Sequence, residues 1–355
     1  MREPASQRAG IPTPGESGVR QVHRLDPDAV GCVSRSDFLM ACEPRHNPNG
    51  PQFEAQALTL ARQLGLLRST NSRRFDAFNS IAAYTYPTAS VERGLANAQW
   101  SNWLFFFDDM HDEDLERCRD TMRVERSIER HLQLLRYGGS VRMISPLERL
   151  TLDLHARLLS LGGEQWLERF CTSAAEYLKL GVLPAVRNWA DGQTPDLDSY
   201  LIQREYDCSM YACIDMIEIA EDIHVPDEIR DSETMKRARR ACARTVGYFN
   251  DIVSYPKEVL KSHNPNNLVH VLVSDQGLTV RQAVLRATDI VNACTRDLLV
   301  AEQELLGTGG THSQAVATYL QGMKNWQRGN VEWSLEGGRY AAPGSPMVEL
   351  NIPLG

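Results

Sequence analysis

Long hydrophobic runs are missing from this chain of 355 residues. A membrane-spanning helix needs about eighteen or more consecutive apolar residues, and no such stretch is present. The N-terminus, which begins Met1-Arg2-Glu3-Pro4, also lacks the apolar segment of a signal peptide. We therefore expect a cytoplasmic protein without stable membrane insertion.

An excess of basic charge is lacking as well. The chain holds 38 Lys and Arg against 46 Asp and Glu, which gives a formal net charge of −8. Nucleic acids bind to clearly basic surfaces, so this balance argues against a nucleic-acid partner. The negative net charge does not exclude a small anionic ligand, because a few local cationic side chains or a metal ion can neutralise such a ligand.

Cysteines at metal-binding spacing are absent too. The eight cysteines form no Cys-x-x-Cys motif, and none has a histidine partner at the spacing of a zinc site. We expect reduced thiols, as in the cytosol.

Strand patterns are nearly absent beyond the first fifty or so residues, where apolar residues recur at the three- and four-residue spacing of helices. Glycine and proline clusters divide this part, for example at residues 161–163, 190–195 and 263–265. Between such breakers we expect about ten helices, two of them long, over residues 196–221 and 230–255. The pattern predicts an all-α fold.

One helical domain is expected, because no repeat and no Gly/Ser linker divides it. Residues 1–51 are rich in Pro, Gly, Arg, Ser and Asp, and we expect a flexible N-terminal tail there. The domain should cover residues 52–341, and residues 342–355 should form a C-terminal tail.

Two polar segments carry the chemistry. The first, Asp108-Asp109-Met110-His111-Asp112, directly follows an apolar run over residues 103–107. Asp108 and Asp112 are four residues apart and so share one face of a helix. Such pairs usually belong to a solvated face. Carboxylates that emerge from a buried segment, however, repel one another unless a cation is present.

The second segment contains Asn250, Ser254 and Glu258 at successive spacings of four. This spacing places a carboxamide, a hydroxyl and a carboxylate along one face of a helix. Magnesium prefers such oxygen ligands, and it is usually held by one or two carboxylates together with substrate phosphates. Each segment therefore indicates half of a magnesium site that also needs a phosphate group.

These segments resemble the motifs of the class I terpene synthases, particularly the bacterial members. The first resembles the aspartate-rich motif, and Asn250-Asp251-x-x-Ser254-x-x-Lys257-Glu258 resembles the second metal motif. Arg204, 46 residues before Asn250, and the pair Arg339-Tyr340 also match positions at which bacterial members contact diphosphate. The resemblance extends over about residues 75–340.

The resemblance implies a single α-helical barrel around a deep apolar pocket, and a lyase that ionises a prenyl diphosphate. It implies three Mg²⁺ ions, held by Asp108, Asp109, Asp112, Asn250, Ser254 and Glu258. It further implies that the diphosphate is bound by Arg204, Lys257, Arg339 and Tyr340. Asp207 would orient Arg204, and Cys208 stands where the family directs a backbone carbonyl toward the substrate. His111 should only fill a variable position of the first motif.

The pocket of such an enzyme must exclude water, because a carbocation reacts with any nucleophile that it meets. Aromatic faces stabilise a cation without attacking it. The candidates are Phe105, Phe106, Trp103, Trp326 and Trp333, and Trp333 matches a pocket tryptophan of bacterial relatives. For the other four, ordinary core packing is the favoured role.

Three functions compete at this point. The first is a terpene cyclase that acts on a linear prenyl diphosphate, most often farnesyl diphosphate in bacterial relatives, with geranylgeranyl diphosphate as the alternative substrate. The second is a chain-elongating prenyltransferase, which normally carries a second aspartate-rich motif in place of Asn250, Ser254 and Glu258. The third is a catalytically silent helical binding protein. A homodimer is common among relatives and is possible here.

Overall fold

The structure is a computed structural model that describes residues 26–67, 75, 79–111, 120–139, 145–307 and 313–351. In these ranges the chain is mainly helical, and its β-structure is limited to an isolated bridge between Val33 and Met347. The predicted all-α fold is confirmed. None of the described helices combines the length and the apolar character needed to cross a bilayer.

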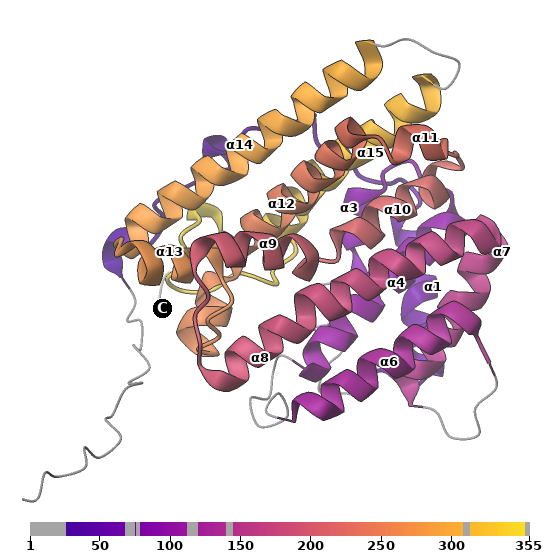
Figure 1. Cartoon of the computed structure of the whole chain (residues 1–355), viewed down its shortest axis with the longest axis horizontal. Helices are drawn as coiled ribbons and strands as arrows, with labels where there is room; N and C mark the ends of the chain where they lie inside the picture. Colours follow the sequence, from indigo (N-terminus) through magenta and orange to yellow (C-terminus); the bar gives the residue numbers. More distant parts are fainter. Residues whose placement is uncertain are drawn as a thin grey trace, which may run out of the picture.

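The larger helices, labelled in Figure 1, are α1 (Gly50–Gln63), α3 (Ile81–Thr85), α4 (Val91–His111), α6 (Thr121–Tyr137), α7 (Pro146–Glu176), α8 (Leu183–Asp191), α9 (Leu197–Asp207), α10 (Met210–Glu221), α11 (Asp227–Arg230), α12 (Glu233–Tyr255), α13 (Leu268–Gln276), α14 (Val280–Gly307) and α15 (Ser313–Glu336). Short 3₁₀-helices are η1 (Pro27–Ala29), η2 (Arg35–Asp37) and η5 (Val348–Leu350). Two π-helices, η3 (Tyr177–Val182) and η4 (Pro256–Lys261), continue α7 and α12.

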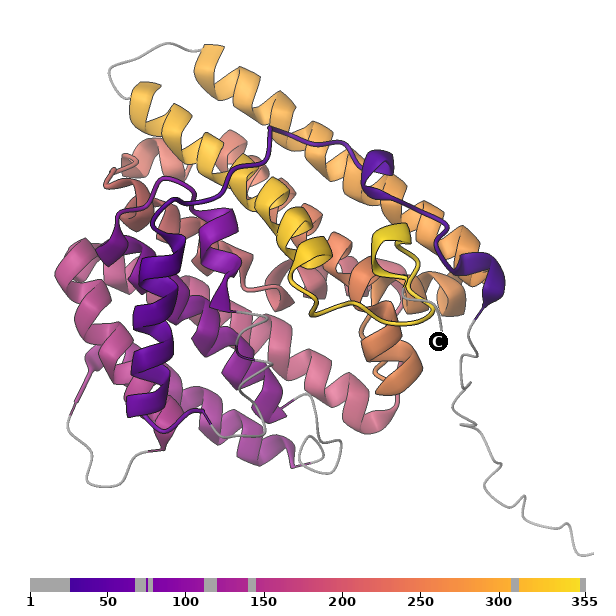
Figure 2. The same cartoon turned by 180° about the vertical axis from the view of Figure 1, so that it is seen from behind.

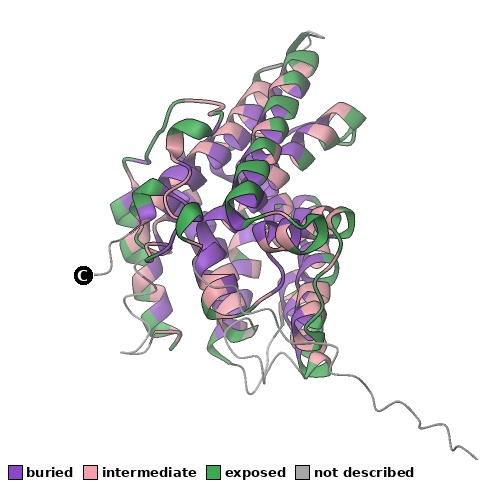
Figure 3. Ribbon diagram, turned by 90° about the vertical axis from the view of Figure 1, so that its left-hand side faces the viewer, coloured by how far each residue is buried: buried purple, intermediate pink, exposed green. Residues whose placement is uncertain are grey.

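The helices surround a central region, with α14 at one edge of the molecule and α6 at the opposite edge (Figure 1). Buried residues lie mainly on the parts of the helices that face the rest of the molecule, and exposed residues lie mainly on the outer parts (Figure 3). A stack of aromatic rings fills part of the core, where Trp103 lies between Trp100 and Phe107 at centroid distances of 5.2 and 4.9 Å.

Local sequence signals account for several helix ends. Ser145 begins α7 with a capping box, in which its hydroxyl accepts from the Glu148 amide and the Glu148 carboxylate accepts from the Ser145 amide. Gly192 ends α8 in the left-handed conformation that favours glycine. The predicted break at residues 161–163 is instead a kink within α7, at Gly163 with a φ of 75°.

The predicted long helix over residues 196–221 is divided in two. Helix α9 ends at Asp207, and Ser209, with a φ of 56°, precedes α10. A serine in this conformation is uncommon and marks a sharp change of chain direction. The other predicted long helix, over residues 230–255, agrees closely with α12.

Residues 26–49 and 342–351, which fall within the two expected tails, pack against the helical body, whereas residues 1–25 and 352–355 lie outside the described residues. Residues 26–49 run along α14 and α15 before α1 begins (Figure 2). Phe38 is buried there, with its ring edge-on to Phe249 of α12 at a centroid distance of 5.0 Å. Met347 and Leu350 of the C-terminal segment are also buried. Apolar residues within a polar stretch thus anchor both segments.

Candidate active site

A cavity of about 170 Å³ lies inside the ring of helices. Its wall is formed mainly by α4, α8, α9, α10, α12 and α15, and both π-helices contribute to it. One part of the wall is polar and carries Asp108, Arg204, Asp207, Asn250, Lys257, Glu258, Asn264, Asn266, Arg339 and Tyr340. The two polar segments recognised in the sequence therefore face one space.

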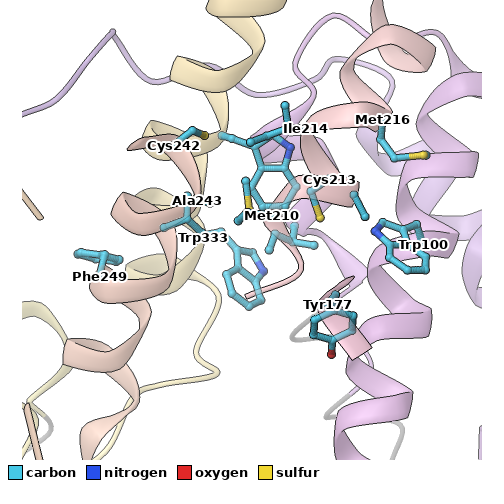
Figure 4. Packing of buried hydrophobic residues seen from close by; sticks show 14 of the residues in the cluster. Trp100, Tyr177, Met210, Cys213, Ile214, Met216, Cys242, Ala243, Phe249 and Trp333 are labelled. Carbon is cyan, nitrogen blue, oxygen red and sulfur yellow. The ribbon is translucent and has the colours of Figure 1, made fainter. Parts of the chain in front are cut away.

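The rest of the wall is largely apolar and aromatic. Phe105, Trp326 and Trp333 line it, as do Tyr177 and Met210. Figure 4 shows Trp333, Met210 and Tyr177 gathered in the interior. A polar end and an aromatic end in one cavity suit a ligand with a charged head and a hydrocarbon body.

Two predicted pocket residues, Phe106 and Trp103, are not among the described lining residues. Trp103 belongs to the aromatic stack with Trp100 and Phe107, and the Phe106 ring stacks on Phe75 at a centroid distance of 5.9 Å. Its neighbours Phe105 and Phe107 both line the cavity. Because successive residues of an α-helix point about 100° apart, adjacent side chains of α4 take different directions, and Phe106 belongs to the core.

Arg204 is buried and held by several acceptors at the polar end. Its Nε donates to Asp251 Oδ1 at 2.8 Å, and its Nη2 donates to Asn250 Oδ1 at 2.9 Å. Asp207, which was expected to orient this guanidinium, accepts through its backbone carbonyl at 3.2 Å, while its carboxylate lies 3.9 Å away. Asp251 is therefore the closer carboxylate partner, and the sequence analysis missed it although it follows Asn250 directly.

Asp251 is fully buried and accepts two further hydrogen bonds. The Tyr200 hydroxyl donates to Oδ2 at 2.6 Å, and the Leu268 amide donates to the same oxygen at 2.9 Å. Burial alone would lower the pKa of Arg204, but Asp251 and the other groups around it raise that pKa well above its usual value. Arg204 thus stays charged and fixed in direction.

Two carboxyl groups at the polar end, those of Asp207 and Glu258, have raised pKa values. Burial raises the pKa of Asp207 to about 7; Arg204 opposes this, and the negative charge of Asp108 adds to it. Burial also raises the pKa of Glu258, and Asp251 contributes in the same direction. Several acidic groups in one buried space repel one another, and a bound cation would relieve that repulsion.

The second polar segment lies at the junction of α12 and η4. Asn250 and Glu258 line the cavity, whereas Ser254 is fully buried beside them. The Ser254 Oγ makes no hydrogen bond within the described part of the chain. A buried hydroxyl without a hydrogen-bond partner is unusual and often marks the site of an ion or a water molecule. The donor set of amide, hydroxyl and carboxylate oxygens therefore fits magnesium.

The first polar segment is described only in part. Asp108 lines the cavity, and Asp109 is not among the described lining residues. Asp112 and the side chain of His111 lie outside the described residues. In the described ranges, no three His, Cys, Asp or Glu side chains form a metal-binding group. The second segment would supply one carboxylate together with an amide and a hydroxyl.

The pair Arg339-Tyr340 connects the polar and aromatic ends. The Arg339 guanidinium lies 4.4 Å from the centroid of the Phe105 ring. The Tyr340 hydroxyl accepts a hydrogen bond from Asn250 Nδ2 at 2.7 Å, and its ring is edge-on to Trp333. The C-terminal pair therefore contacts both α4 and α12, where the two polar segments begin.

Cys208 lies on the cavity wall at the break between α9 and α10. Its thiol donates to the backbone carbonyls of Glu205 and Ala243, so the side chain itself is engaged. The resemblance assigns a role to the backbone carbonyl of Cys208, not to its thiol, and that role remains an expectation. Besides Asp251, the sequence analysis missed the lining residues Asn264 and Asn266, because isolated asparagines in a loop carry no distinctive spacing.

Comparison with known proteins agrees with this geometry. Residues 99–297 match the family described as terpene synthase family 2, C-terminal metal binding. The chain is 29% identical over 298 residues to a (+)-T-muurolol synthase of Roseiflexus castenholzii described as farnesyl diphosphate cyclizing; the match covers 83% of this chain and 90% of that protein. It is 26% identical over 292 residues to germacrene A synthase of Nostoc punctiforme, with 81% and 89% covered.

Solved structures show the same fold. Germacradien-4-ol synthase of Streptomyces citricolor superimposes with a TM-score of 0.73 at 22% identity, covering 85% of this chain and all but 1% of that one. Linalool/nerolidol synthase of Streptomyces clavuligerus gives a TM-score of 0.75 at 22% identity, with 84% and 99% covered. Because the family match spans more than half of the chain and includes both polar segments, this protein belongs to the terpene synthase family and is a class I terpene synthase.

Proposed function

We propose that this enzyme is a magnesium-dependent cyclase that converts farnesyl diphosphate into a cyclic sesquiterpene and releases pyrophosphate. The observation that carries the proposal is the single cavity with acidic and basic groups at one end and aromatic rings at the other. The curated relative described as farnesyl diphosphate cyclizing supports the fifteen-carbon substrate.

The metal would be held by Asp108 on one side and by Asn250, Ser254 and Glu258 on the other, with Asp109 and Asp112 completing the first motif. By family resemblance three ions are expected. When bound, magnesium neutralises the charge that develops on the leaving diphosphate. The partnerless hydroxyl of Ser254 and the raised pKa of Glu258 support this assignment.

Arg204, Lys257, Arg339 and Tyr340 would bind the diphosphate oxygens. Arginine suits this task because its guanidinium is always charged and carries five N–H donors, so that it can be held by the protein and still donate to a phosphate oxygen. In the structure Arg204 already has its Nε and Nη2 engaged by Asp251 and Asn250. Its direction is therefore set before a substrate arrives, which reduces the entropic cost of binding.

The aromatic end would shape and protect the hydrocarbon. Trp326 and Trp333 on α15 and Phe105 on α4 present rings to the cavity. Ring faces attract a cation by their quadrupole, and an apolar wall keeps water from it. The released pyrophosphate would accept the final proton, so no dedicated base is required.

The test is an incubation of purified enzyme with geranyl, farnesyl or geranylgeranyl diphosphate, with and without Mg²⁺, followed by gas chromatography with mass detection. We expect a cyclic fifteen-carbon product from farnesyl diphosphate only when Mg²⁺ is present. A product from geranylgeranyl diphosphate alone would contradict the substrate assignment. Longer linear diphosphates, formed when isopentenyl diphosphate is added, would show a prenyltransferase instead.

A matched pair of variants on one stretch of chain tests the metal site. Glu258→Gln should reduce turnover by about tenfold or more, the scale on which disturbed metal sites lose activity. Glu233→Gln serves as the control, because Glu233 lies at the solvent-exposed start of α12 and forms an ion pair with Lys236 at the surface. Equal activity of the two variants at limiting Mg²⁺ would remove Glu258 from the site.

A further inference from the structure

Asn267 is a fully buried residue at the start of α13. Its Oδ1 caps this helix by accepting from the amides of Val269 and His270. The Nδ2 group points the other way and donates two hydrogen bonds. It contacts the Asp251 backbone carbonyl at 2.8 Å and Glu258 Oε2 at 3.0 Å. One side chain therefore ties the start of α13 to both ends of the second polar segment.

The carboxylate of Glu258 has few other means of being held. It lies in the π-helix η4, and within the described part of the chain it accepts a hydrogen bond from Asn267. A buried carboxylate is costly unless it is hydrogen-bonded, and a hydrogen bond to the charged form favours that form.

The same junction also fixes Arg204. The Leu268 amide, next to Asn267, donates to Asp251 Oδ2, and Asp251 in turn binds Arg204 Nε. The start of α13 is therefore hydrogen-bonded to the carboxylate of Glu258 directly and to the guanidinium of Arg204 through Asp251.

We propose that Asn267 is a positioning residue of the second metal half-site, which fixes the direction of the Glu258 carboxylate through its Nδ2 group. The proposal rests on the proposed function, in which Glu258 binds magnesium. Groups that orient metal ligands in this way typically contribute about 10- to 100-fold in metal affinity.

The test separates this role from simple helix capping. Serine and aspartate are both good N-caps, so Asn267→Ser and Asn267→Asp retain the cap but lose the amide donor. Mg²⁺ binding is measured by isothermal titration calorimetry in the presence of inorganic pyrophosphate, without turnover. We expect about tenfold weaker Mg²⁺ binding in Asn267→Ser. The loss should be larger in Asn267→Asp, where a second carboxylate faces Glu258.

Ser232→Ala is the matched control, because Ser232 caps α12 through the Met235 amide and lies far along the helix from the site. It should lower the melting temperature and leave Mg²⁺ binding unchanged. If either Asn267 variant is too unstable for calorimetry, the rise in its own melting temperature on addition of Mg²⁺ and pyrophosphate gives the same comparison.

A double-mutant cycle tests whether Asn267 affects Mg²⁺ affinity through Glu258. In a Glu258→Gln background, Asn267→Ser should cause little further loss of Mg²⁺ affinity, because the residue acts through Glu258. Wild-type affinity in Asn267→Ser, or an equal loss in both backgrounds, would overturn the proposal. If Glu258→Gln itself binds Mg²⁺ as tightly as the wild type, the proposed function of Glu258 fails, and that outcome differs from a failure at Asn267 alone.

Discussion

At the scale of single residues, this protein keeps polar groups in places where a stable core would not. Ser254 and Asn330 are both buried, and Ser254 Oγ and Asn330 Nδ2 have no hydrogen-bond partner in the described chain. Leaving such a group unpaired costs about 1–3 kcal/mol. Residues that reduce stability without improving the packing or hydrogen bonding of the fold tend to mark functional sites. Both residues lie at the cavity or beside it.

Asn330 offers a direct test of this cost. It lies four residues after Trp326 and three before Trp333, and all three line the cavity. Asn330→Leu keeps the size of the side chain and removes the unpaired amide. The free energy of unfolding should stay the same or rise by about 1 kcal/mol, while the product distribution from the substrate changes. Denaturant unfolding and product analysis measure the two effects.

Asn325 on the same helix is the control for that variant. Its Oδ1 accepts a hydrogen bond from Gln321 Nε2 at 3.0 Å, and the residue is buried to a similar degree. Asn325→Leu should therefore destabilise the protein by about 1 kcal/mol or more, because it breaks an existing bond. A clear loss of stability in Asn330→Leu would show that the Asn330 amide is satisfied after all.

At the scale of helices, the two π-helices shape the cavity. π-Helices are rare and frequently occur at functional sites. Here η4 carries Lys257 and Glu258, and η3 brings Tyr177 and Val182 to the opposite wall. Gly181 of η3 lies directly against the end of α9, since a Cβ at this position would lie 2.5 Å from the Asp207 Cα. The break between α9 and α10 is thus packed against a glycine.

Gly181→Ala tests that contact. Helix propensity alone would make alanine more stable than glycine by about 1 kcal/mol. The collision with the Asp207 backbone should reverse the sign and destabilise the protein by about 1–3 kcal/mol, and activity should fall because Arg204 and Cys208 flank the displaced segment. Gly307→Ala is the control, because a Cβ at Gly307 would meet nothing within 4 Å. A more stable, fully active Gly181→Ala would refute the close approach.

At the scale of the whole molecule, the N-terminal segment is part of the folded domain. The Arg35 guanidinium binds Glu332 of α15 at 2.9 Å, and Val33 pairs with Met347 of the C-terminal segment. Phe38 packs on Phe249, the residue before Asn250. This segment therefore supports both the helix that carries the second metal motif and the segment that follows Arg339 and Tyr340.

Phe38→Ala should lower the free energy of unfolding by about 3 kcal/mol, the lower end of the range for a buried phenylalanine. Leu39→Ala, at the neighbouring position with 39% of its surface exposed, should change it by less than about 0.5 kcal/mol. Thermal and denaturant unfolding of the two variants give the comparison. Equal stability of both would mean that the segment does not contribute to the folded domain.

The sequence by itself determined the helical class, the course of α12 and the presence of both polar segments. These features depend on local periodicity and on spacing along one helix, which residues a few positions apart fix between themselves. The same local spacing is enough to place Asp108, Asn250 and Glu258 on helices.

Only the tertiary structure decided which of these side chains meet and what holds them. Whether Phe105 or Phe106 faces the cavity depends on how α4 is rotated against its neighbours. The partnership of Arg204 with Asp251 and the hold of Asn267 on Glu258 join residues on different helices, and the anchoring of residues 26–49 depends on packing against α12 and α15. Such contacts arise from the packing of distant segments into one core, which no local pattern encodes.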